Sequence, residues 1–312
     1  MVPSEREAAE IALAYRGCAV ASVVRFPMGL AHWVYDVAFS TGDRIVVRLT
    51  KPELRRAMLG AVHWSTVLRP LGVPLPELLA HGEHRGFPYV VLERLAGEDL
   101  GLVYERLTSA QRQDVAGEVC RVQQLVATLP NGSGYGSLSL PTDPHHPTWR
   151  GYVDEILSAS RQRIEEAGVV STRAVDRVEQ AAAQLDQYFA SIRPRPFLDD
   201  ATTKNVLVHE GRFSGLVDVD ELGFGDSLLT IGLTRASLLA AGRDSEYTDF
   251  WLAELSATAE QRTAIAFYTA LFIVVFMSEQ GQRFNRDIAP PDMALLARLE
   301  LLLEQNLHVV AG

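Results

Sequence analysis

Two carboxylates and an amide in the second half of the chain have the residue types and the spacing of a metal-dependent site. Asp200 is followed five residues later by Asn205 and, thirteen residues after that, by Asp218. The apolar stretches between the last two flank Glu210-Gly211, a pair that favours a tight hairpin turn because glycine adopts a positive φ without steric cost. Such a hairpin brings the Asp218 carboxylate beside the Asn205 amide, and these hard oxygen ligands suit Mg²⁺, which also takes phosphates and water. The pattern predicts a magnesium site on this hairpin, with Asp200 one loop away.

Length and composition limit the classes of protein that can carry such a site. The chain has 312 residues, 47% of them hydrophobic, which is enough for two packed lobes. Its formal net charge of −10 argues against a nucleic-acid or anionic-membrane surface and favours a neutral or cationic partner, although surplus surface acid also serves solubility. We therefore expect neither a nucleic-acid partner nor a membrane partner.

Targeting and membrane signals are weak. Cys18 and Cys120 form neither a disulfide framework nor a metal-binding spacing, which fits a reducing cytoplasm. The polar N-terminus lacks the apolar core of a signal peptide. The longest apolar run, Ala264 to Met277, is interrupted by Tyr268 and Thr269 and is shorter than the ~18–20 residues of a membrane span. The sequence therefore predicts a cytoplasmic protein in which this run is a buried helix.

The first third of the chain has the pattern of an antiparallel sheet. After a helix at 4–15, short segments rich in β-branched and aromatic residues alternate with turn residues. Pro52 opens a helix that ends before Gly72. The expected strands lie at 19–26, 33–39, 44–49, 77–81 and 89–93. Together these elements form an expected first lobe, residues 1–97, with a connector near 93–97.

From residue 98 onward the pattern is mostly helical. The exception is the hairpin within 205–220, the only strong strand pair that the pattern indicates here. A small sheet-rich lobe followed by a larger helical lobe, 98–312, is an α+β, two-lobed arrangement. The expected helices lie at 109–129, 149–166, 172–192, 228–241, 247–255, 260–282 and 291–307.

Several conspicuous side chains have an ordinary structural explanation. Asp226 precedes a helical run and is expected to cap it. His145 and His146 are expected at the surface, and Lys204 is expected to be solvated. The larger aromatic residues of the second lobe are expected to build its core, namely Trp149, Tyr152, Trp251 and Tyr268.

The motifs around the hairpin resemble one known family. The run NVLVHEGRFSGLVDVDELGFGD is similar to the stretch in which an Asn-Val strand leads to an Asp-x-Asp motif and then to a Gly-Asp pair, here Gly225-Asp226. Upstream, GVPLPELLAHG and YVVLERLAGEDL are similar to first-lobe strands and hinge of the same family. The chain thus resembles the aminoglycoside phosphotransferase and choline kinase family. This resemblance implies a protein-kinase-like fold and phosphoryl transfer from ATP or GTP with Mg²⁺.

The resemblance also implies roles for individual residues. Within the catalytic loop, 198–205, Asp200 matches the aspartate that orients or deprotonates the acceptor hydroxyl, and Asn205 and Asp218 match the metal ligands. Arg48, on the third strand, matches the cation that pairs with the phosphates. Asp220 is placed to support the metal site or the acceptor.

The remaining implied contacts belong to the nucleotide. Gly29, in the stretch FPMGLAHWVY, matches the phosphate loop, although a single glycine is weak support by itself. Glu93 and Leu95 lie where hinge backbone groups meet an adenine.

Two departures from the family pattern concern the catalytic loop and the ion pair of Arg48. Leu198 and Asp199 replace the usual His and Gly before the catalytic aspartate. The helix after the third strand has no acidic residue where an ion-pair partner for Arg48 is expected, and Glu53 at its start is the candidate substitute.

The resemblance therefore predicts an ATP- or GTP-dependent, Mg²⁺-requiring phosphotransferase for a hydroxyl of an aminoglycoside-like antibiotic or another small hydroxylated metabolite. Acidic pairs at Asp154-Glu155 and Glu165-Glu166 could face a polycationic sugar. An alternative is a kinase-like protein that binds nucleotide without turnover, because of Leu198 and the missing helix acid. A third reading, a hydrolase using Asp199 and Asp200 as paired carboxylates, leaves the Asn205 and Asp218 spacing unexplained.

Overall fold

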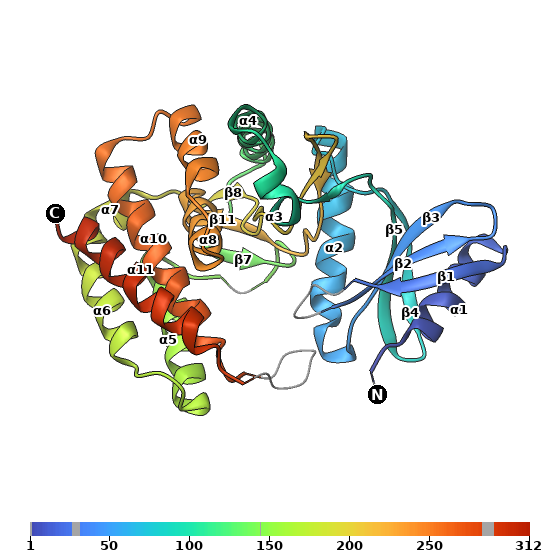
Figure 1. Cartoon of the computed structure of the whole chain (residues 1–312), viewed down its shortest axis with the longest axis horizontal. Helices are drawn as coiled ribbons and strands as arrows, with labels where there is room; N and C mark the ends of the chain where they lie inside the picture. The colour runs from blue at the N-terminus through green and yellow to red at the C-terminus, as the bar shows by residue number, and fades with distance from the viewer. Residues whose placement is uncertain (1, 27–31, 144, 283–289) are drawn as a thin grey trace.

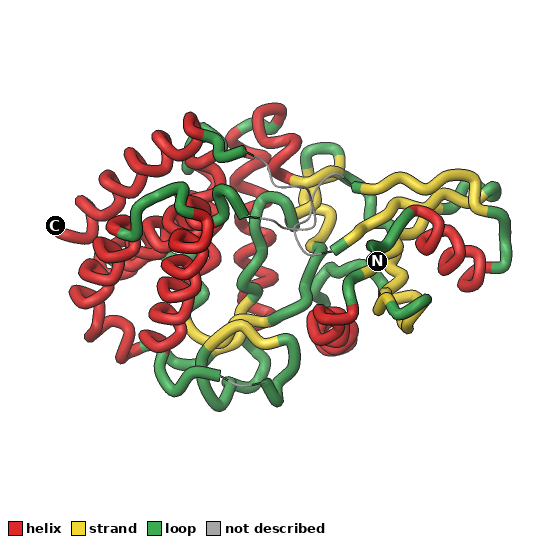
Figure 2. Tube along the Cα trace, turned by 90° about the horizontal axis from the view of Figure 1, so that it is seen from below, coloured by secondary structure: helices red, strands yellow, loops and turns green. Residues whose placement is uncertain are grey.

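A five-stranded antiparallel sheet forms one end of the molecule, and helices form most of the other end (Figure 1, Figure 2). The computed structural model describes residues 2–26, 32–143, 145–282 and 290–312. The sheet order is β1-β2-β3-β5-β4, so the predicted meander of the first three strands is confirmed. The strands are β1 (Val20–Arg25), β2 (Trp33–Phe39), β3 (Arg44–Leu49), β4 (Leu78–His84) and β5 (Phe87–Glu93).

The N-terminal helix α1 (Glu5–Arg16) packs on this sheet and completes a small core. Ser4 and Glu7 form a capping box at its start, which satisfies free backbone N–H groups. Its buried residues meet inward-facing side chains of β2 such as Trp33 and Tyr35, both almost fully buried. The alternation in β2 and β3 therefore positions the sheet against α1 and holds Arg48 on a well-ordered strand.

Helix α2 (Arg55–Leu68) lies between the sheet and the helical lobe (Figure 1). It follows the 3₁₀ turn η1 (Pro52–Leu54) and ends in η2 (Arg69–Leu71). Trp64 and Leu68 are buried in the hydrophobic core of the second lobe, not in the core under the sheet. The helix predicted for the first lobe is therefore, by its packing, part of the contact between the lobes.

The second lobe is built mainly from helices around α10, which contacts α5, α6, α8 and α11. The helix predicted at 172–192 is instead two helices separated by the 3₁₀ turn η4 (Ala183–Leu185). A further 3₁₀ turn, η3 (Tyr104–Arg106), precedes α4. The helices are α3 (Leu100–Val103), α4 (Ser109–Val126), α5 (Trp149–Ala167), α6 (Arg173–Ala182), α7 (Asp186–Ser191), α8 (Leu228–Ala240), α9 (Glu246–Glu254), α10 (Ala259–Ser278) and α11 (Met293–Ala311).

Two small sheets position the catalytic segment, and one of them was missed by the sequence patterns. The hairpin of β9 (Val206–His209) and β10 (Arg212–Leu216) pairs with β6 (Glu98–Asp99). A separate sheet has the order β7-β11-β8, from β7 (Gly136–Leu138), β8 (Arg195–Phe197) and β11 (Leu222–Gly225). The expectation of a single strand pair in this lobe was wrong, because strands of three or four residues are too short to show a two-residue period.

Helix α10 corrects one expectation about membrane spans. It begins at Ala259, before the apolar run, and by length and composition it is sufficient to cross a membrane. However, 67% of its most apolar window is buried inside the protein, and the core helix of a soluble protein has the same composition. The helix that contains the apolar run is therefore long enough to cross a membrane, contrary to the expectation from the run alone. The prediction of a buried C-terminal helix is confirmed.

Candidate active site

A cavity of about 250 Å³ lies at the junction of the lobes and contains both predicted acids, Asp200 and Asp218. Its walls are residues 198–201 and 216–221 of the second lobe, with His32 and Ala57 from the first. We call it the first cavity. The structure thus brings Asp200, predicted on a loop, and Asp218, predicted at the end of a hairpin, to a common site.

The β9–β10 hairpin positions Asp218 beside Asn205. Glu210 and Gly211 have φ values of 50° and 76°, the left-handed pair that a tight two-residue hairpin turn requires. The N–H of Val217 donates to the backbone carbonyl of Asn205 at 2.9 Å. This bond holds the end of the hairpin, and with it Asp218, next to Asn205. Asp218 itself has a φ of 63°, an unfavourable conformation for a residue other than glycine.

The side chain of Asn205 supports the catalytic loop. Its Nδ2 donates to the backbone carbonyl of Asp200 at 2.8 Å, and the residue is 5% exposed. Thr202 donates from its hydroxyl to Asp200 Oδ1 at 3.2 Å. Because the amide nitrogen is committed to this carbonyl, the amide oxygen is the atom of Asn205 that can act as a metal ligand.

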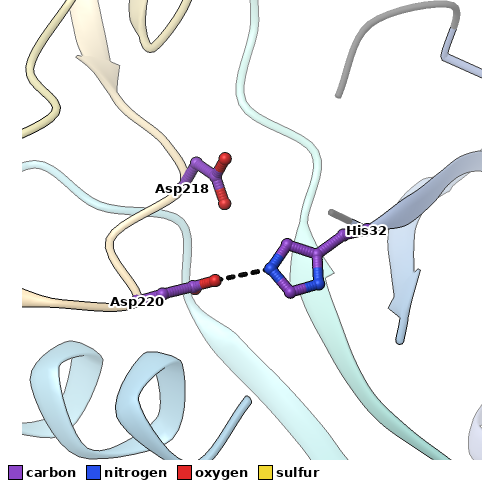
Figure 3. Close-up of side chains that lie close together, drawn as sticks. All are labelled: His32, Asp218 and Asp220. Atoms are coloured by element: carbon purple, nitrogen blue, oxygen red, sulfur yellow. Dashed lines mark ion pairs between the residues drawn. The ribbon is translucent and has the colours of Figure 1, made fainter. Parts of the chain in front are cut away.

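Arg48 is buried and holds the two acids that follow the hairpin. Its Nη1 lies 2.7 Å from Asp218 Oδ1, and its Nη2 pairs with Asp220. Asp220 also pairs with His32, whose Nε2 lies 2.8 Å from its second carboxylate oxygen (Figure 3). Burial alone would raise the pKa of Asp220, but the charge of Arg48 and the bond and charge of His32 hold it below its usual range.

Asp220 is therefore the residue that takes the place of the missing helix acid. Glu53 is exposed on η1, and Arg48 is paired with Asp218 and Asp220 instead, so the expectation for Glu53 was wrong. Gly60 shows how closely α2 approaches this segment: a Cβ at Gly60 would lie 2.0 Å from the Asp220 carbonyl oxygen. A helix packed this tightly against the 218–220 segment leaves no room for a side chain at that position.

The family histidine replaced by Leu198 has a substitute that the sequence patterns did not reveal. The side-chain amide of Gln123 donates to the Leu198 carbonyl at 2.8 Å and accepts from the Leu198 N–H at 2.9 Å. Thr230 donates to the same carbonyl at 2.8 Å. Leu198 is itself buried, so the loop is held by its backbone from α4 and α8. Neither the half-buried Gln123 nor the buried Thr230 can be recognised as a support until the loop is known to lie beside it.

Burial changes the acidity of the two adjacent aspartates. It raises the pKa of Asp200 to about 6, with nearby Asp218 also raising it while Lys204 and two hydrogen bonds lower it. Burial raises the pKa of Asp199 to about 7, with Glu221 and Asp200 adding to the effect and a hydrogen bond from Ser137 opposing it. The Ser137 hydroxyl contacts both Asp199 and Glu221. Asp199 is thus bonded to a residue of strand β7, and its proximity to Glu221 was not foreseen.

The predicted nucleotide contacts are only partly described. Gly29 lies outside the described residues. Glu93 ends β5, where its N–H donates to the Glu77 carbonyl at 2.9 Å and its carboxylate accepts from the Glu77 N–H at 3.0 Å. Leu95 is half-buried in the connector that follows. Neither lines the first cavity, so the structure does not bring them to Asp200, and their roles stay predictions.

A second cavity, of about 340 Å³, lies on the other side of Asp199 and Asp200. Tyr152 is half-buried in its wall, so the expectation that all four large aromatic residues build the core was wrong for this one. The helices α5, α8 and α10 supply the other walls, with Glu155, Ile156, Ala159, Arg163, Leu229, Leu233, Phe272 and Val275.

The other structural expectations hold in this lobe. Trp149, Trp251 and Tyr268 are at most 2% exposed. Asp226 accepts from the N–H of Leu228 at 3.0 Å, and so caps the start of α8 as predicted. It also accepts hydrogen bonds from two tyrosine hydroxyls, Tyr188 at 2.7 Å and Tyr268 at 2.8 Å. Lys204 and His145 are exposed, but His146 is half-buried against Glu155.

A two-lobed fold with Asp200 and Asp218 on either side of the β9–β10 hairpin can now be compared with known proteins. The model of the phosphotransferase enzyme family matches residues 22–266, which is more than half of the chain. The chain belongs to this family. The predicted membership of the aminoglycoside phosphotransferase family, the kinase-like α+β fold and the assignment as a small-molecule kinase are thereby confirmed.

Solved phosphotransferases share the fold at low sequence identity. A thermostable variant of aminoglycoside phosphotransferase APH(4)-Ia, in complex with ADP and hygromycin B, is 16% identical with a TM-score of 0.70, covering 97% of this chain and 99% of that chain. The GDP complex of aminoglycoside 2'-phosphotransferase-IIIa is 12% identical with a TM-score of 0.69, covering 98% and 99%. A putative fructosamine-3-kinase from Haemophilus somnus 129PT is 11% identical with a TM-score of 0.67, covering 97% of both chains.

Proposed function

We propose that this phosphotransferase moves the γ-phosphoryl group of ATP or GTP to a hydroxyl of a small molecule, with Asp200 as the residue that receives the hydroxyl proton. The observation that carries the proposal is the position of Asp200 between two cavities. One is lined by Asp218 and Asp220, which pair with the buried Arg48, and the other is lined by helices of the second lobe. Two substrates that must exchange a phosphoryl group can therefore approach the same carboxylate from opposite sides.

The chemistry of the first cavity suits a triphosphate and its cation. Phosphoryl transfer depends mainly on positioning and on neutralising charge, so it requires hard oxygen ligands and a cation at the phosphates. The amide oxygen of Asn205 and the carboxylate of Asp218 are such ligands, which fits Mg²⁺. When bound, Mg²⁺ would neutralise charge on the β- and γ-phosphates. Arg48 lies 2.7 Å from Asp218, close enough to exchange this carboxylate for a phosphate oxygen.

Asp200 has the acidity expected of a group that accepts a proton near neutral pH. With a pKa of about 6, it is mostly ionised at pH 7 and remains basic enough to take the proton as the acceptor oxygen bonds to phosphorus. Thr202 and Asn205 hold its loop. The acceptor in this proposal is an aminoglycoside-like antibiotic or another hydroxylated metabolite. We also propose that the enzyme acts in the cytoplasm.

The alternative of a nucleotide-binding protein without turnover rested on two departures, and both have a structural substitute. Gln123 and Thr230 hold the loop backbone where the family histidine is replaced by Leu198. Asp220 pairs with Arg48 where the helix acid is missing. These contacts favour the active enzyme.

The test combines nucleotide binding with turnover. We expect ATP or GTP with Mg²⁺ to raise the melting temperature, with ~2.7 kcal/mol of stabilisation at a hundredfold excess over the dissociation constant. Asp200→Asn should keep this shift but lower acceptor-dependent turnover by roughly 10²–10⁴-fold, the usual contribution of a general base. Asp186→Asn, which changes an exposed aspartate paired with Arg150, is the matched control and should leave turnover unchanged.

Two results would count against the proposal. If no nucleotide shifts the melting temperature, the assignment of the first cavity fails. If Asp200→Asn transfers phosphate as fast as the unmodified protein, the role of Asp200 fails.

A further inference from the structure

The second cavity has walls that are mainly apolar. Ile156 from α5, Leu233 from α8, and Phe272 and Val275 from α10 all line it. Helix α10 contacts both α5 and α8, so the three helices are packed together in the second lobe (Figure 1). The polar groups of the cavity, by contrast, are concentrated where Asp199 and Asp200 form its boundary with the first cavity.

The apolar residues of this wall are less buried than their neighbours on the same helices. Leu229 is buried, whereas Leu233, one turn later on α8, is only half-buried. On α10, Phe272 and Val275 are half-buried, although Leu271, Ile273 and Val274 are fully buried. Large apolar side chains left partly open inside a concave site, rather than scattered on the surface, are typical of a ligand pocket.

The charged groups at the rim of the cavity already have partners. Glu155 lies 2.6 Å from His146. Arg163 donates through Nε to the hydroxyl of Ser278 at 3.0 Å, on the neighbouring helix. The rim charges are therefore committed to the protein itself, which reduces what they can offer to a highly charged ligand.

The acidic pairs on α5 do not provide the surface that a polycationic acceptor needs. Asp154 pairs with Arg150 at 2.7 Å and does not line the cavity, and Glu165 and Glu166 are exposed near the end of the helix. Of the four acids proposed to face a polycationic sugar, only Glu155 lines the cavity. Most of these acidic side chains of α5 therefore lie outside the cavity that contains Asp200.

We infer that the acceptor carries its hydroxyl on an apolar skeleton, which packs on the wall formed by Ile156, Leu233, Phe272 and Val275. The inference rests on the proposed function, because it assigns the acceptor to the cavity beside Asp200. The volume of about 340 Å³ is within the range of pockets that enclose drug-sized ligands.

The transfer in this arrangement is balanced within the two cavities. The acceptor oxygen forms a bond to the γ-phosphorus, and the bond between that phosphorus and the oxygen bridging to the β-phosphate breaks. The electron pair of the broken bond leaves with the nucleoside diphosphate, and the hydroxyl proton passes to Asp200. The apolar skeleton takes no part in these bonds but keeps the hydroxyl oriented toward Asp200 and excludes water from that side.

The test uses one hydroxylated head group with apolar tails of increasing length, methyl, butyl and hexyl β-D-glucoside, in the presence of Mg²⁺ and AMP-PNP. Calorimetric titration should show affinity rising by up to about fourfold for each methylene that is buried. Hygromycin B serves as the polycationic probe and should bind more weakly than the hexyl compound. Equal affinity along the alkyl series, or tighter binding of hygromycin B, would overturn the inference.

Two variants test whether the alkyl tail binds to this wall. Leu233→Glu should remove most of the dependence on tail length, and Val275→Thr, a change of similar size that is compatible with folding, should weaken hexyl glucoside binding several-fold. Leu301→Glu introduces the same charge on the exposed face of α11, where the residue is 59% exposed, and should have no effect. An unchanged dependence on tail length in both wall variants would show that the tail binds elsewhere.

The proposed function can fail separately from this inference. Failure of AMP-PNP to bind would remove the nucleotide assignment, whereas a response to tail length that Leu233→Glu abolishes would still establish the apolar site. Binding of nucleotide without any response to tail length would leave the phosphotransferase assignment intact and refute the apolar acceptor.

Discussion

On one side of Asp200 the first cavity has ionisable groups from both lobes in its wall, whereas on the other side the second cavity is lined mainly by apolar residues, all from the second lobe. His32 from the sheet lobe lines the first cavity and pairs with Asp220 (Figure 3), and the buried Arg48 pairs with Asp218 and Asp220 across the same junction. In the second, the lining helices α5 and α8 both pack on α10, and no residue of the sheet lobe lines the cavity.

This difference means that the two substrates depend on different parts of the fold. A nucleotide has to exchange ion pairs that already link the lobes, so its affinity includes the free energy of those pairs. An acceptor meets a wall that is fixed by helix packing within one lobe. Changes to the buried ion pairs should therefore affect stability and nucleotide binding, while changes to the apolar wall should affect acceptor binding only.

The largest effect should come from the charged side. Arg48→Met removes a 4% exposed guanidinium and leaves Asp218 and Asp220 without it. Breaking a buried pair on one side typically costs about 3–5 kcal/mol because the remaining charge stays buried, and here that charge is mainly Asp220, since Asp218 is 44% exposed. We expect urea denaturation to show a loss of this size in the free energy of unfolding, together with a weaker melting-temperature shift from ATP.

A surface arginine gives the control. Arg121→Met breaks a pair with Glu118 in which the two side chains are 51% and 46% exposed, and should cost less than about 1 kcal/mol. If the two variants lose the same stability, the buried pairs across the junction are not what distinguishes the first cavity.

A second, somewhat smaller effect concerns Asp199, which borders both cavities. Its pKa of about 7 in the folded protein is above the ordinary value of 3.8, so the folded state holds a proton that the unfolded state releases. The free energy of unfolding should therefore fall as the pH rises from about 4 to about 7, by roughly 3 kcal/mol from this group.

Asp199→Asn should remove that part of the pH dependence, and urea denaturation at several pH values measures it. A residual slope should remain below pH 6, because the pKa of Asp200 is raised as well. A stability profile with the same slope in the variant would contradict the assignment to Asp199.

The smallest expected effect is on the pH dependence of turnover. Because Asp200 has to be ionised to accept a proton, kcat/KM should rise with pH up to about 6 and then level off, with roughly a tenfold loss at one pH unit below this value. Lys204 lowers the pKa of Asp200, so Lys204→Met should move the midpoint to higher pH. Lys51→Met, at the other lysine of the chain, is the control and should leave the midpoint in place. A midpoint that does not respond to Lys204→Met would assign the profile to another group.

Most of the sheet lobe could be predicted because its signals are local. The strand segments 33–39 and 44–49 coincide with β2 and β3, since alternation, branched side chains and flanking turn residues act within a few positions. The helix start at Thr108 was visible for the same reason, because its capping box closes within four residues. Strands β7, β8 and β11 escaped notice because their three or four residues pair only with distant segments.

The candidate site divides in the same way. Asp200, Asn205 and Asp218 could be recognised because the hairpin fixes their separation along a short piece of chain. Gln123 and Ser137 could not, because each lies more than sixty residues from the aspartate loop that it supports or contacts.

The sequence by itself determined the hairpin, its left-handed turn and the set of oxygen ligands, because steric preference and residue spacing act locally. Tertiary structure alone decided that Asp220 replaces the missing helix acid, since Arg48 and Asp220 are 172 positions apart and meet only where the lobes join. It also decided that the wall beside Asp200 is apolar, because the residues that form it come from three helices whose packing is not encoded in any one of them.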